Sequence, residues 1–174
     1  MKERIEKYQK KLDDIIDFIK SDLKEFMKDL NFNATTNAIQ VLNLKEESDI
    51  FNAIYGRGFY IILTDKKFDD NKCEFEFEDK KAIYRGHSYF VKKRLLSHLA
   101  NKKYQGQRKS SEPNYKVCLK IEELINGINI NEEPYNKWNW TIIILKMNNS
   151  SKLMREQAEL AFDELYHRPI KSRE

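Results

Sequence analysis

The apolar positions of the first thirty residues are spaced as on one face of an α-helix. Their steps of three and four residues average close to the helical period of about 3.6, along the series Ile5, Tyr8, Leu12, Ile16, Ile19, Leu23, Phe26 and Leu30. This spacing predicts one or two amphipathic helices over Lys2–Leu30. The period alone does not decide whether this segment folds back on its own domain, which is the commoner arrangement, or forms the seam of a dimer.

Four further segments have the apolar patterns of β-strands. The run Phe59–Leu63 is apolar throughout, which indicates a buried strand. The segment Glu74–Glu78 alternates between acidic and aromatic residues, so both phenylalanines should face the core and the acids the solvent. Lys81–Gly86 and Trp138–Lys146 are also typical of strands, whereas Ala38–Leu44 fits either a short strand or a helix.

Two later segments have helical spacing. In Tyr89–Ala100 the apolar residues form one stripe and three consecutive cations lie off it. Leu153–Tyr166 is amphipathic, with Ser150 or Ser151 as its N-terminal cap. The pattern of Tyr115–Leu124 is ambiguous and could continue as a helix. The order strand, strand, helix, strand, helix predicts a small α/β or α+β sheet with helices packed on it.

Length and composition narrow the class of protein. A chain of 174 residues favours one domain plus a helical extension. Leu, Ile, Val and Phe make up 46 residues, about 26% of the chain, which is above the roughly 20% associated with disorder. No apolar run approaches the ~18 residues of a membrane span, and the N-terminus lacks the apolar stretch of a signal peptide. Cys73 and Cys118 match no zinc spacing, so we expect reduced thiols and a cytoplasmic location.

The distribution of charge is more informative than the net charge of +4. Lys80–Lys109 carries ten Lys and Arg side chains and no Asp or Glu, whereas Asp65–Asp79 carries seven acids against three lysines. A basic stretch of one sign attracts polyanions and releases counterions from a phosphate backbone. Taken alone, such a run is more often a solvated basic face, so its meaning depends on the other residues within it.

Glycine and tyrosine residues flank two of the predicted strands. Gly58-Phe59-Tyr60 opens the first core strand, and Tyr84-Arg85-Gly86 ends another. Arg94 follows Tyr84 by ten residues on a predicted helix, and His98 lies one turn further on. A phenol, a guanidinium and an imidazole therefore follow one another within the basic stretch, and a second phenol precedes it on another predicted strand.

This layout resembles the GIY-YIG nuclease superfamily. The two triplets stand where the family has Gly-Ile-Tyr and Tyr-Ile-Gly, and the ten-residue step to a helical arginine is similar as well. The segment 153–159, followed by Tyr166 and Pro169, resembles the helix that supplies the family's metal-binding glutamate, with Glu159 in that place. The resemblance covers about Gly56–Ser172, roughly two-thirds of the chain.

The resemblance implies an α+β fold with a small, mostly antiparallel three-stranded sheet flanked by helices. Residues 1–50 would be an N-terminal helical extension and residues 51–174 the catalytic domain, with the acidic hairpin 65–79 as an insertion. This sequence departs from the family pattern at two further places. His87 follows the second glycine where a lysine is frequent, and Ser172 stands where an asparagine is frequent.

The residue chemistry suits phosphodiester hydrolysis. This reaction needs a deprotonated water, a cation on the non-bridging oxygens and charge relief for the leaving oxygen. Glu159 can hold one Mg²⁺ or Mn²⁺, and Arg94 offers a planar fork to the phosphate. A tyrosine, whose ordinary pKa is near ~10, acts as a base only where cations stabilise its phenolate. The resemblance favours Tyr60 as that base, with Tyr84 in support and His98 orienting a tyrosine.

The expected function is therefore that of a Mg²⁺-dependent DNA endonuclease of the restriction or mobile-element type. Contacts with phosphate and DNA are expected at Arg85, His87, Lys92, Lys93, Lys102, Lys103 and Arg108. The expected partner is DNA and not a membrane. A homodimer through the N-terminal helix is a further option.

Several alternatives stay open. Glu156, one turn before Glu159, could bind the metal instead. Asp70 with Glu78-Asp79-Lys80 superficially fits a different nuclease metal site, although such a triplet arises easily by chance in a chain rich in Glu and Lys. The same fold could be a catalytically silent nucleic-acid-binding module, and the charged helix could belong to a regulatory protein with a protein partner.

Overall fold

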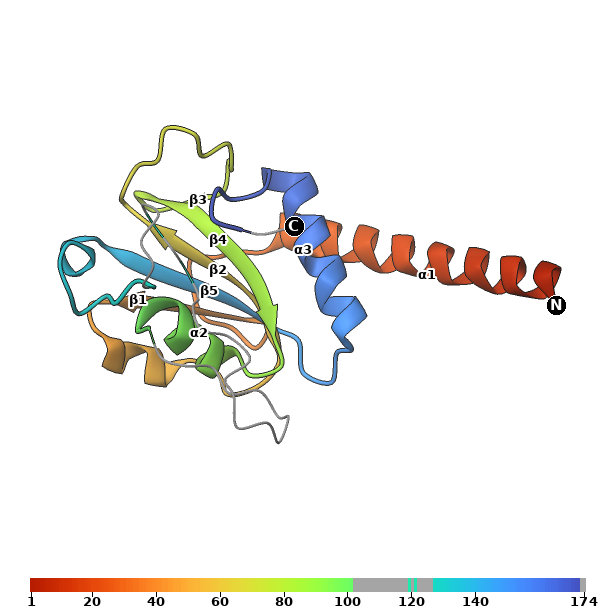
Figure 1. Ribbon diagram of the computed structural model, residues 1–174, viewed down its shortest axis with the longest axis horizontal. Coiled ribbons are helices and arrows are strands. Elements are labelled where there is room, and N and C mark those ends of the chain that lie inside the picture. The colour runs from red at the N-terminus through yellow and green to blue at the C-terminus, as the bar shows by residue number, and fades with distance from the viewer. Residues whose placement is uncertain (102–118, 120, 122–126, 173–174) are drawn as a thin grey trace.

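The computed structural model describes residues 1–101, 119, 121 and 127–172 of the chain. Within these residues, five antiparallel strands form one sheet with helices against both of its faces (Figure 1). The predicted α+β class is therefore confirmed, but the expected three-stranded sheet is wrong. The two additional strands lie at the edges of the sheet, where the sequence pattern was short or ambiguous.

The sheet has the strand order β1-β5-β2-β4-β3. Its strands are β1 (Ile39–Leu44), β2 (Gly58–Thr64), β3 (Glu76–Phe77), β4 (Lys80–Ser88) and β5 (Trp140–Lys146). The central strand β2 is buried along its whole length, as its apolar run predicts. The segment that fitted either a strand or a helix is β1, which pairs with β5 along its full length.

Three α-helices and two short 3₁₀ helices surround the sheet within the described residues. They are α1 (Lys2–Asp29), η1 (Glu47–Asn52), α2 (Val91–Leu99), η2 (Tyr135–Lys137) and α3 (Lys152–Tyr166). The hydroxyl group of Ser151 accepts a hydrogen bond from the backbone N–H of Met154 and so caps α3, which selects one of the two predicted caps. No helix of the described chain combines the length and the apolar character that a bilayer span requires.

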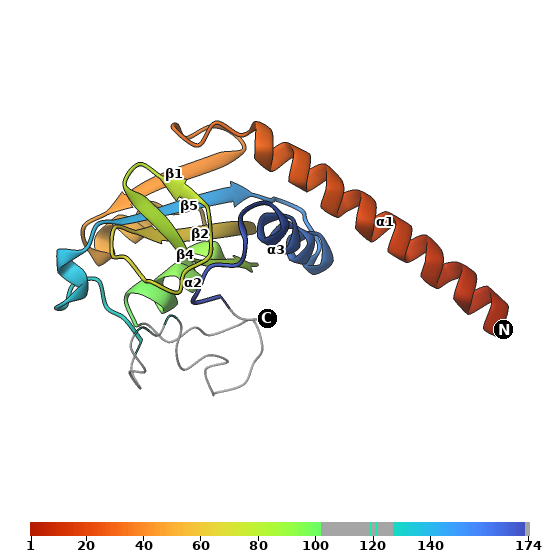
Figure 2. The ribbon, with the colours of Figure 1, turned by 90° about the horizontal axis from the view of Figure 1, so that it is seen from above.

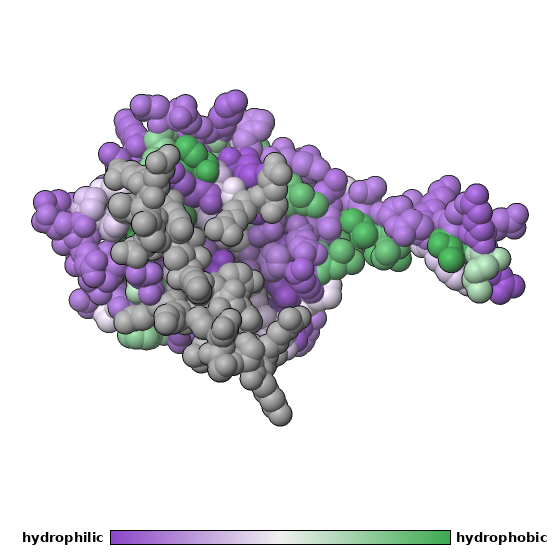
Figure 3. Space-filling model, in the orientation of Figure 1, coloured by the Kyte–Doolittle hydropathy of each residue, from purple (hydrophilic) through white to green (hydrophobic). Residues whose placement is uncertain are grey.

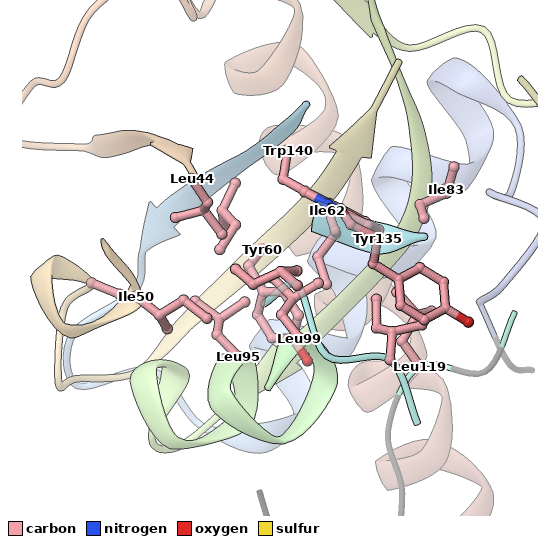
Figure 4. Packing of buried hydrophobic residues seen from close by; sticks show 14 of the residues in the cluster. Leu44, Ile50, Tyr60, Ile62, Ile83, Leu95, Leu99, Leu119, Tyr135 and Trp140 are labelled. Carbon is pink, nitrogen blue, oxygen red and sulfur yellow. Dashed lines mark hydrogen bonds between the residues drawn. The ribbon is translucent and has the colours of Figure 1, made fainter. Parts of the chain in front are cut away.

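Helices α2 and α3 cover opposite faces of the sheet (Figure 2). On the α2 side, Tyr60 lies in one buried cluster with Leu95 (Figure 4). On the α3 side, the rings of Phe59 and Phe162 pack with their centroids 5.6 Å apart. Since neighbouring residues of a strand point to opposite faces, the single run Phe59-Tyr60 supplies both layers of the core.

Helix α1 is one continuous helix, and its contacts with the other described residues are made by its C-terminal half. Met27 is buried, and Lys20 and Lys24 form ion pairs with Glu164 of α3. The N-terminal half projects away from the sheet and its helices (Figures 1 and 2). The predicted amphipathic helix is confirmed, and it folds back on its own domain over only about half of its length.

The acidic hairpin follows the predicted alternation. Phe75 and Phe77 are buried, whereas Glu74, Glu76 and Glu78 are exposed. Only Glu76–Phe77 forms a regular strand, paired with the start of β4. The expected domain boundary at residue 50 falls inside η1, and because β1 belongs to the sheet, the helical extension proper is α1. The ambiguous segment 115–124, which could continue as a helix, lies outside the described residues apart from the buried Leu119 and Ile121.

Candidate active site

The pairing of β2 with β4 brings the two tyrosine motifs side by side. Tyr60 lies directly opposite Gly86, and the rings of Tyr60 and Tyr84 stack with their centroids 6.2 Å apart. A Cβ atom on Gly86 would lie 2.7 Å from the Tyr60 hydroxyl oxygen and 2.9 Å from a ring carbon of Tyr84. The second glycine is therefore required because both phenol rings lie against its backbone.

Helix α2 completes this cluster from above the same face of the sheet. The hydroxyl group of Tyr60 lies 2.9 Å from Nε2 of His98, and the His98 ring packs on Tyr84 with the centroids 4.4 Å apart. The charge of the Arg94 side chain acts on both phenol groups and opposes the rise of their pKa values. Because Arg94 and His98 are four residues apart on a helix, one face of α2 presents both to the tyrosines. The structure thus brings together four of the five predicted catalytic residues.

The two phenols differ in their access to solvent. Tyr60 is fully buried, whereas Tyr84 is partly exposed. Burial raises the pKa of Tyr60 well above its ordinary value, the charges of Tyr84 and Glu159 raise it further, and Arg94 opposes them. Burial also raises the pKa of Tyr84, against the opposing effect of Arg94. Of the two phenols, Tyr84 is therefore the one that is open to solvent.

Glu159 lies at the edge of the sheet, on the α3 side of β4. Its carboxylate oxygens lie 3.2 Å from Nη1 of Arg85 and 3.3 Å from Nδ1 of His87. Arg85 and His87 alternate along β4 with Tyr84 and Gly86, so the carboxylate and the phenols lie on opposite faces of this strand. Its charge still acts across the strand, because it raises the pKa of both phenols.

Arg85 is a buried structural residue of the site and not an exposed phosphate ligand. Its side chain is 6% exposed and forms a bidentate pair with Asp163, with N–O distances of 3.0 and 2.6 Å. Burial lowers the pKa of Arg85, but its bonds to Asp163 and the charge of Glu159 outweigh this effect and raise the pKa overall. The expected contact of Arg85 with DNA is therefore not supported, and its contacts assign it to holding Glu159 in place.

Ser172, which stands where an asparagine is frequent in the resembling family, has a defined contact. Its hydroxyl oxygen accepts a hydrogen bond from the backbone N–H of Arg85 at 2.8 Å, and the backbone N–H of Lys171 donates to the carbonyl oxygen of Ile83. The C-terminal segment therefore hydrogen-bonds to backbone groups of β4 along the part of its outer edge that the short strand β3 does not cover. A serine makes this supporting contact without an asparagine.

No protein-family model, no curated protein and no solved structure matches this chain. The resemblance to GIY-YIG nucleases thus depends on the motif residues and on the contacts that they make.

The other predicted site residues lie at varied distances from this cluster. Glu156 forms an exposed pair with Lys152 of the preceding turn and contacts none of the cluster residues in any described interaction, which favours Glu159 as the relevant carboxylate. Lys92 is half-buried, and Lys93 is exposed, with its ammonium group above the ring of Phe90. The remaining predicted DNA contacts lie outside the described residues: Lys102, Lys103 and Arg108.

A pair of arginines beside the site was not predicted from the sequence. The guanidinium groups of Arg57 and Arg155 lie 4.1 and 6.0 Å from the ring centroid of Tyr89, and both donate to the carbonyl oxygen of Ser150. Within the described residues neither arginine forms an ion pair with a carboxylate. Burial and the charge of Arg57 lower the pKa of Arg155. Arg155 lies one helical turn before Glu159, which is the signal that could have identified it.

The donor set of the site fits a hard divalent cation only in part. Among the described residues, no three His, Cys, Asp or Glu side chains converge on a point that could hold a metal ion. Mg²⁺ commonly binds through one or two carboxylates and completes its shell with water and phosphate oxygens. Each oxygen of Glu159 lies near one nitrogen atom, of Arg85 or of His87, and a carboxylate oxygen carries two lone pairs, so this single carboxylate retains room for a metal.

The alternative carboxylate site near the hairpin is not assembled in the same way. A cavity of about 490 Å³ lies between 64–71 and 76–81, and Glu78, Asp79 and Lys80 line it. Asp70 does not line this cavity, and Lys80 instead forms an ion pair with Glu78 at 2.6 Å. None of the phenols, Arg94 or Glu159 lines it either, so this cavity is separate from the tyrosine cluster.

Proposed function

We propose that this protein is a DNA endonuclease of the GIY-YIG type that uses Mg²⁺ or Mn²⁺ to hydrolyse phosphodiester bonds, with a restriction or mobile-element role. The observation that supports this function is the cluster of Tyr60, Tyr84, Arg94 and His98 around Gly86. Two phenols and a guanidinium at the edge of a basic segment suit a phosphate better than a neutral ligand. Glu159 lies on the other face of β4, beside Arg85 and His87, and its charge raises the pKa of Tyr84.

The solvent exposure of the two phenols and the charge of Arg94 indicate the roles of the residues. Tyr84 is the general base, because it is the partly exposed phenol, and its phenolate takes a proton from the attacking water. Tyr60 and His98 form the buried support that fixes Tyr84 in position. Arg94 binds the non-bridging phosphate oxygens and favours the ionised form of Tyr84. This division exchanges the expected roles of the two tyrosines.

Glu159 is the residue that would hold the metal ion. Arg85 and His87 orient its carboxylate, as partners of a metal-binding carboxylate commonly do. A bound Mg²⁺ would supply positive charge that stabilises the phosphate oxygens and the Tyr84 phenolate.

The proposed DNA surface extends from α2 to the arginine pair. Lys92 and Lys93 directly precede Arg94 on α2, and the half-buried Arg57 precedes β2. Arg155 is 4% exposed, so it contributes to this surface through its charge and not through direct contact. Burial lowers the pKa of Arg155, and the charge of Arg57 lowers it further against the opposing charge of Glu156, so two like charges lie close together here, and their positive potential favours a phosphate. Tyr89 between them offers an exposed ring and hydroxyl group.

We also retain the proposed cytoplasmic location. Cys73 is a free and buried thiol, and burial raises its pKa to about 11, so it is protonated and unreactive at neutral pH. A thiol of this kind suits a reducing compartment.

A catalytically silent nucleic-acid-binding module is the second candidate. Both oxygens of Glu159 already lie beside Arg85 and His87, and Tyr60 is fully buried with a raised pKa. A site that has lost its turnover could keep these contacts for stability alone.

Plasmid nicking separates the two candidates. Supercoiled DNA is incubated with Mg²⁺ and the wild-type protein, Glu159→Gln or Arg94→Ala, at equal concentration. The matched controls are Glu156→Gln, a more exposed glutamate one turn away on α3, and Lys137→Ala, an exposed lysine of η2 outside the proposed DNA surface. The endonuclease proposal expects nicking by the wild type and both controls, and a loss of at least about 100-fold in the two site variants.

DNA binding is measured on the same five proteins by fluorescence anisotropy. Binding with no nicking by any of them supports the silent module and contradicts the endonuclease. Nicking that is equal in wild type and Glu159→Gln contradicts the proposed site, because a carboxylate that holds the metal cannot be neutralised without loss.

A further inference from the structure

The N-terminal half of α1 carries an apolar stripe that nothing in the described structure covers. Its members are between 45% and 63% exposed: Ile5, Tyr8, Leu12 and Ile15. Phe18, at the flank of the stripe, is 70% exposed. Figure 3 shows separate apolar patches along the helix where it projects from the body. The four stripe residues recur at steps of three and four, so they share one helix face and are not a scatter of single residues.

The stripe continues the face that α1 uses against α3. Ile16, Ile19 and Leu23 are half-buried, and Met27 is fully buried, in the part of α1 that packs on the α3 side of the core. One apolar face is therefore covered in the second half of the helix and bare in the first. A helix segment of about 14 residues is marginal in water without a packing partner, so a covering surface would stabilise it.

The bare stripe is symmetric along the helix. Its steps of three, four and three residues are the same when read in either direction, with the centre at Lys10. In an antiparallel pair about this centre, Ile5 of one copy lies opposite Ile15 of the other, and Tyr8 lies opposite Leu12. A two-fold axis requires such a self-complementary surface.

The charges of the same segment are complementary in one orientation only. Residues 2–11 carry five cations and two anions, whereas residues 12–18 carry three anions and no cation. Antiparallel pairing about Lys10 places residues 2–11 of one copy along residues 9–18 of the other, so the net charges attract. A parallel pair in register would place like charges side by side.

We propose that two copies of this chain form an antiparallel dimer through the N-terminal halves of their α1 helices. The paired segment 2–18 is about 26 Å long at about 1.5 Å per residue, so the interface is small and the dimer forms and separates with concentration. The proposal does not depend on the endonuclease function. If both hold, the dimer carries two sites, and each can cut one strand.

Sedimentation equilibrium on the full chain tests the association. The wild type is expected to pass from monomer to dimer as its concentration rises. The double variant Tyr8→Gln with Leu12→Gln is expected to weaken the dimer by about tenfold or more, because it removes two buried apolar contacts. Lys10→Gln with Asp14→Gln is the matched control, since it keeps the net charge and lies on the opposite face of the helix.

Cysteine cross-linking tests the orientation. Ile5→Cys mixed with Ile15→Cys is expected to give a disulfide-linked heterodimer under mild oxidation, with the wild type as the control for the native thiols. A strong Ile5→Cys homodimer would show a parallel pair and overturn the antiparallel arrangement.

The remaining outcomes also decide the proposal. A wild type that stays monomeric at every concentration overturns it, and so does a dimer that the Tyr8→Gln, Leu12→Gln variant leaves unchanged. If the monomeric chain instead co-sediments with vesicles of anionic lipid through α1, the stripe is a lipid-binding face and the dimer is excluded.

Discussion

The hydroxyl group of Tyr60 lies 2.9 Å from Nε2 of His98, although the two residues are 38 positions apart and belong to β2 and α2. Both side chains are fully buried. This hydrogen bond fixes the helix to the sheet at the point where the ring of His98 packs on Tyr84. The position of the partly exposed phenol therefore depends on a polar contact inside the core.

Tyr60→Phe is expected to destabilise the protein through this contact. The substitution keeps the ring but leaves Nε2 of His98 without its phenol partner in a buried place, so the free energy of unfolding should fall by about 1–3 kcal/mol. Urea denaturation at neutral pH measures the change. Tyr55→Phe, at an exposed ring, is the control and should change stability by less than about 0.5 kcal/mol. Equal losses in both variants would remove the argument for the Tyr60–His98 bond.

Gly86→Ala tests the close approach of the two phenols. A Cβ atom at 2.7 Å from the Tyr60 hydroxyl oxygen must displace a ring that has no free space around it, at a cost of about 1–3 kcal/mol. Gly56→Ala is the matched control, because its Cβ atom would meet only the end of the Asn148 side chain at 2.9 Å, which can move. Thermal unfolding of both variants gives the comparison. A Gly56→Ala protein that is as unstable as Gly86→Ala would contradict the packing argument.

The sequence predicted the elements whose apolar patterns fit one period only. The apolar run of β2, the alternation of the acidic hairpin and the stripe of α2 each indicated which residues are buried. The segment of β1 was ambiguous because Ile39–Leu44 neither alternates strictly nor is apolar throughout. The expected three-stranded sheet was wrong at β1, because the pairing of β1 with β5 is a tertiary contact that a local sequence pattern does not reveal.

The contacts of the site could be predicted where the spacing of a motif determines them. They could not be predicted where segments distant in sequence meet. The register of β2 and β4 brought Tyr60 beside Tyr84 as the paired triplets suggested. By contrast, the direction of Arg85 follows from its place in the alternation of β4 and from the carboxylate of Asp163, which no spacing predicts. The Arg57 and Arg155 pair depends in the same way on three separate segments that meet at Tyr89.

Asp163→Asn is expected to loosen the support of Glu159. The asparagine retains one acceptor but removes the charge from a bidentate pair with the buried Arg85, so stability should fall by about 1.5–3 kcal/mol. Glu156→Gln, which removes only an exposed pair with Lys152, should have almost no effect. Denaturation in urea measures both. If Asp163→Asn is as stable as Glu156→Gln, Arg85 is not held by this pair.

The raised pKa values of Tyr60 and Tyr84 predict a loss of stability in alkali. The folded protein holds both phenolic protons more tightly than the unfolded chain does, so the stabilisation is complete below the unfolded pKa of about 10 and declines as pH rises above it. The decline approaches about 1.4 kcal/mol per pH unit for each phenol. Because Tyr60→Phe removes one of these groups, the stability difference between wild type and variant should narrow above about pH 10. Urea midpoints from pH 8 to 11 test this, and a difference that stays constant would contradict it.

The ion pairs of Glu164 predict an acid-sensitive contact between α1 and α3. Hydrogen bonds from Lys20 and Lys24 lower the pKa of Glu164, so its contribution is complete above the ordinary glutamate pKa and is lost as pH falls through the lowered value. The pair is largely exposed, and Glu164→Gln should cost less than about 1 kcal/mol at neutral pH, with a smaller effect in high salt. Glu25→Gln, which removes an exposed pair within α1 alone, is the control. Hydrogen exchange of the α1 amides provides the readout: Glu164→Gln should speed exchange in the second half of α1 at pH 7 and approach the wild type at pH 3. Equal exchange in both proteins at pH 7 would show that Glu164 does not hold the helix.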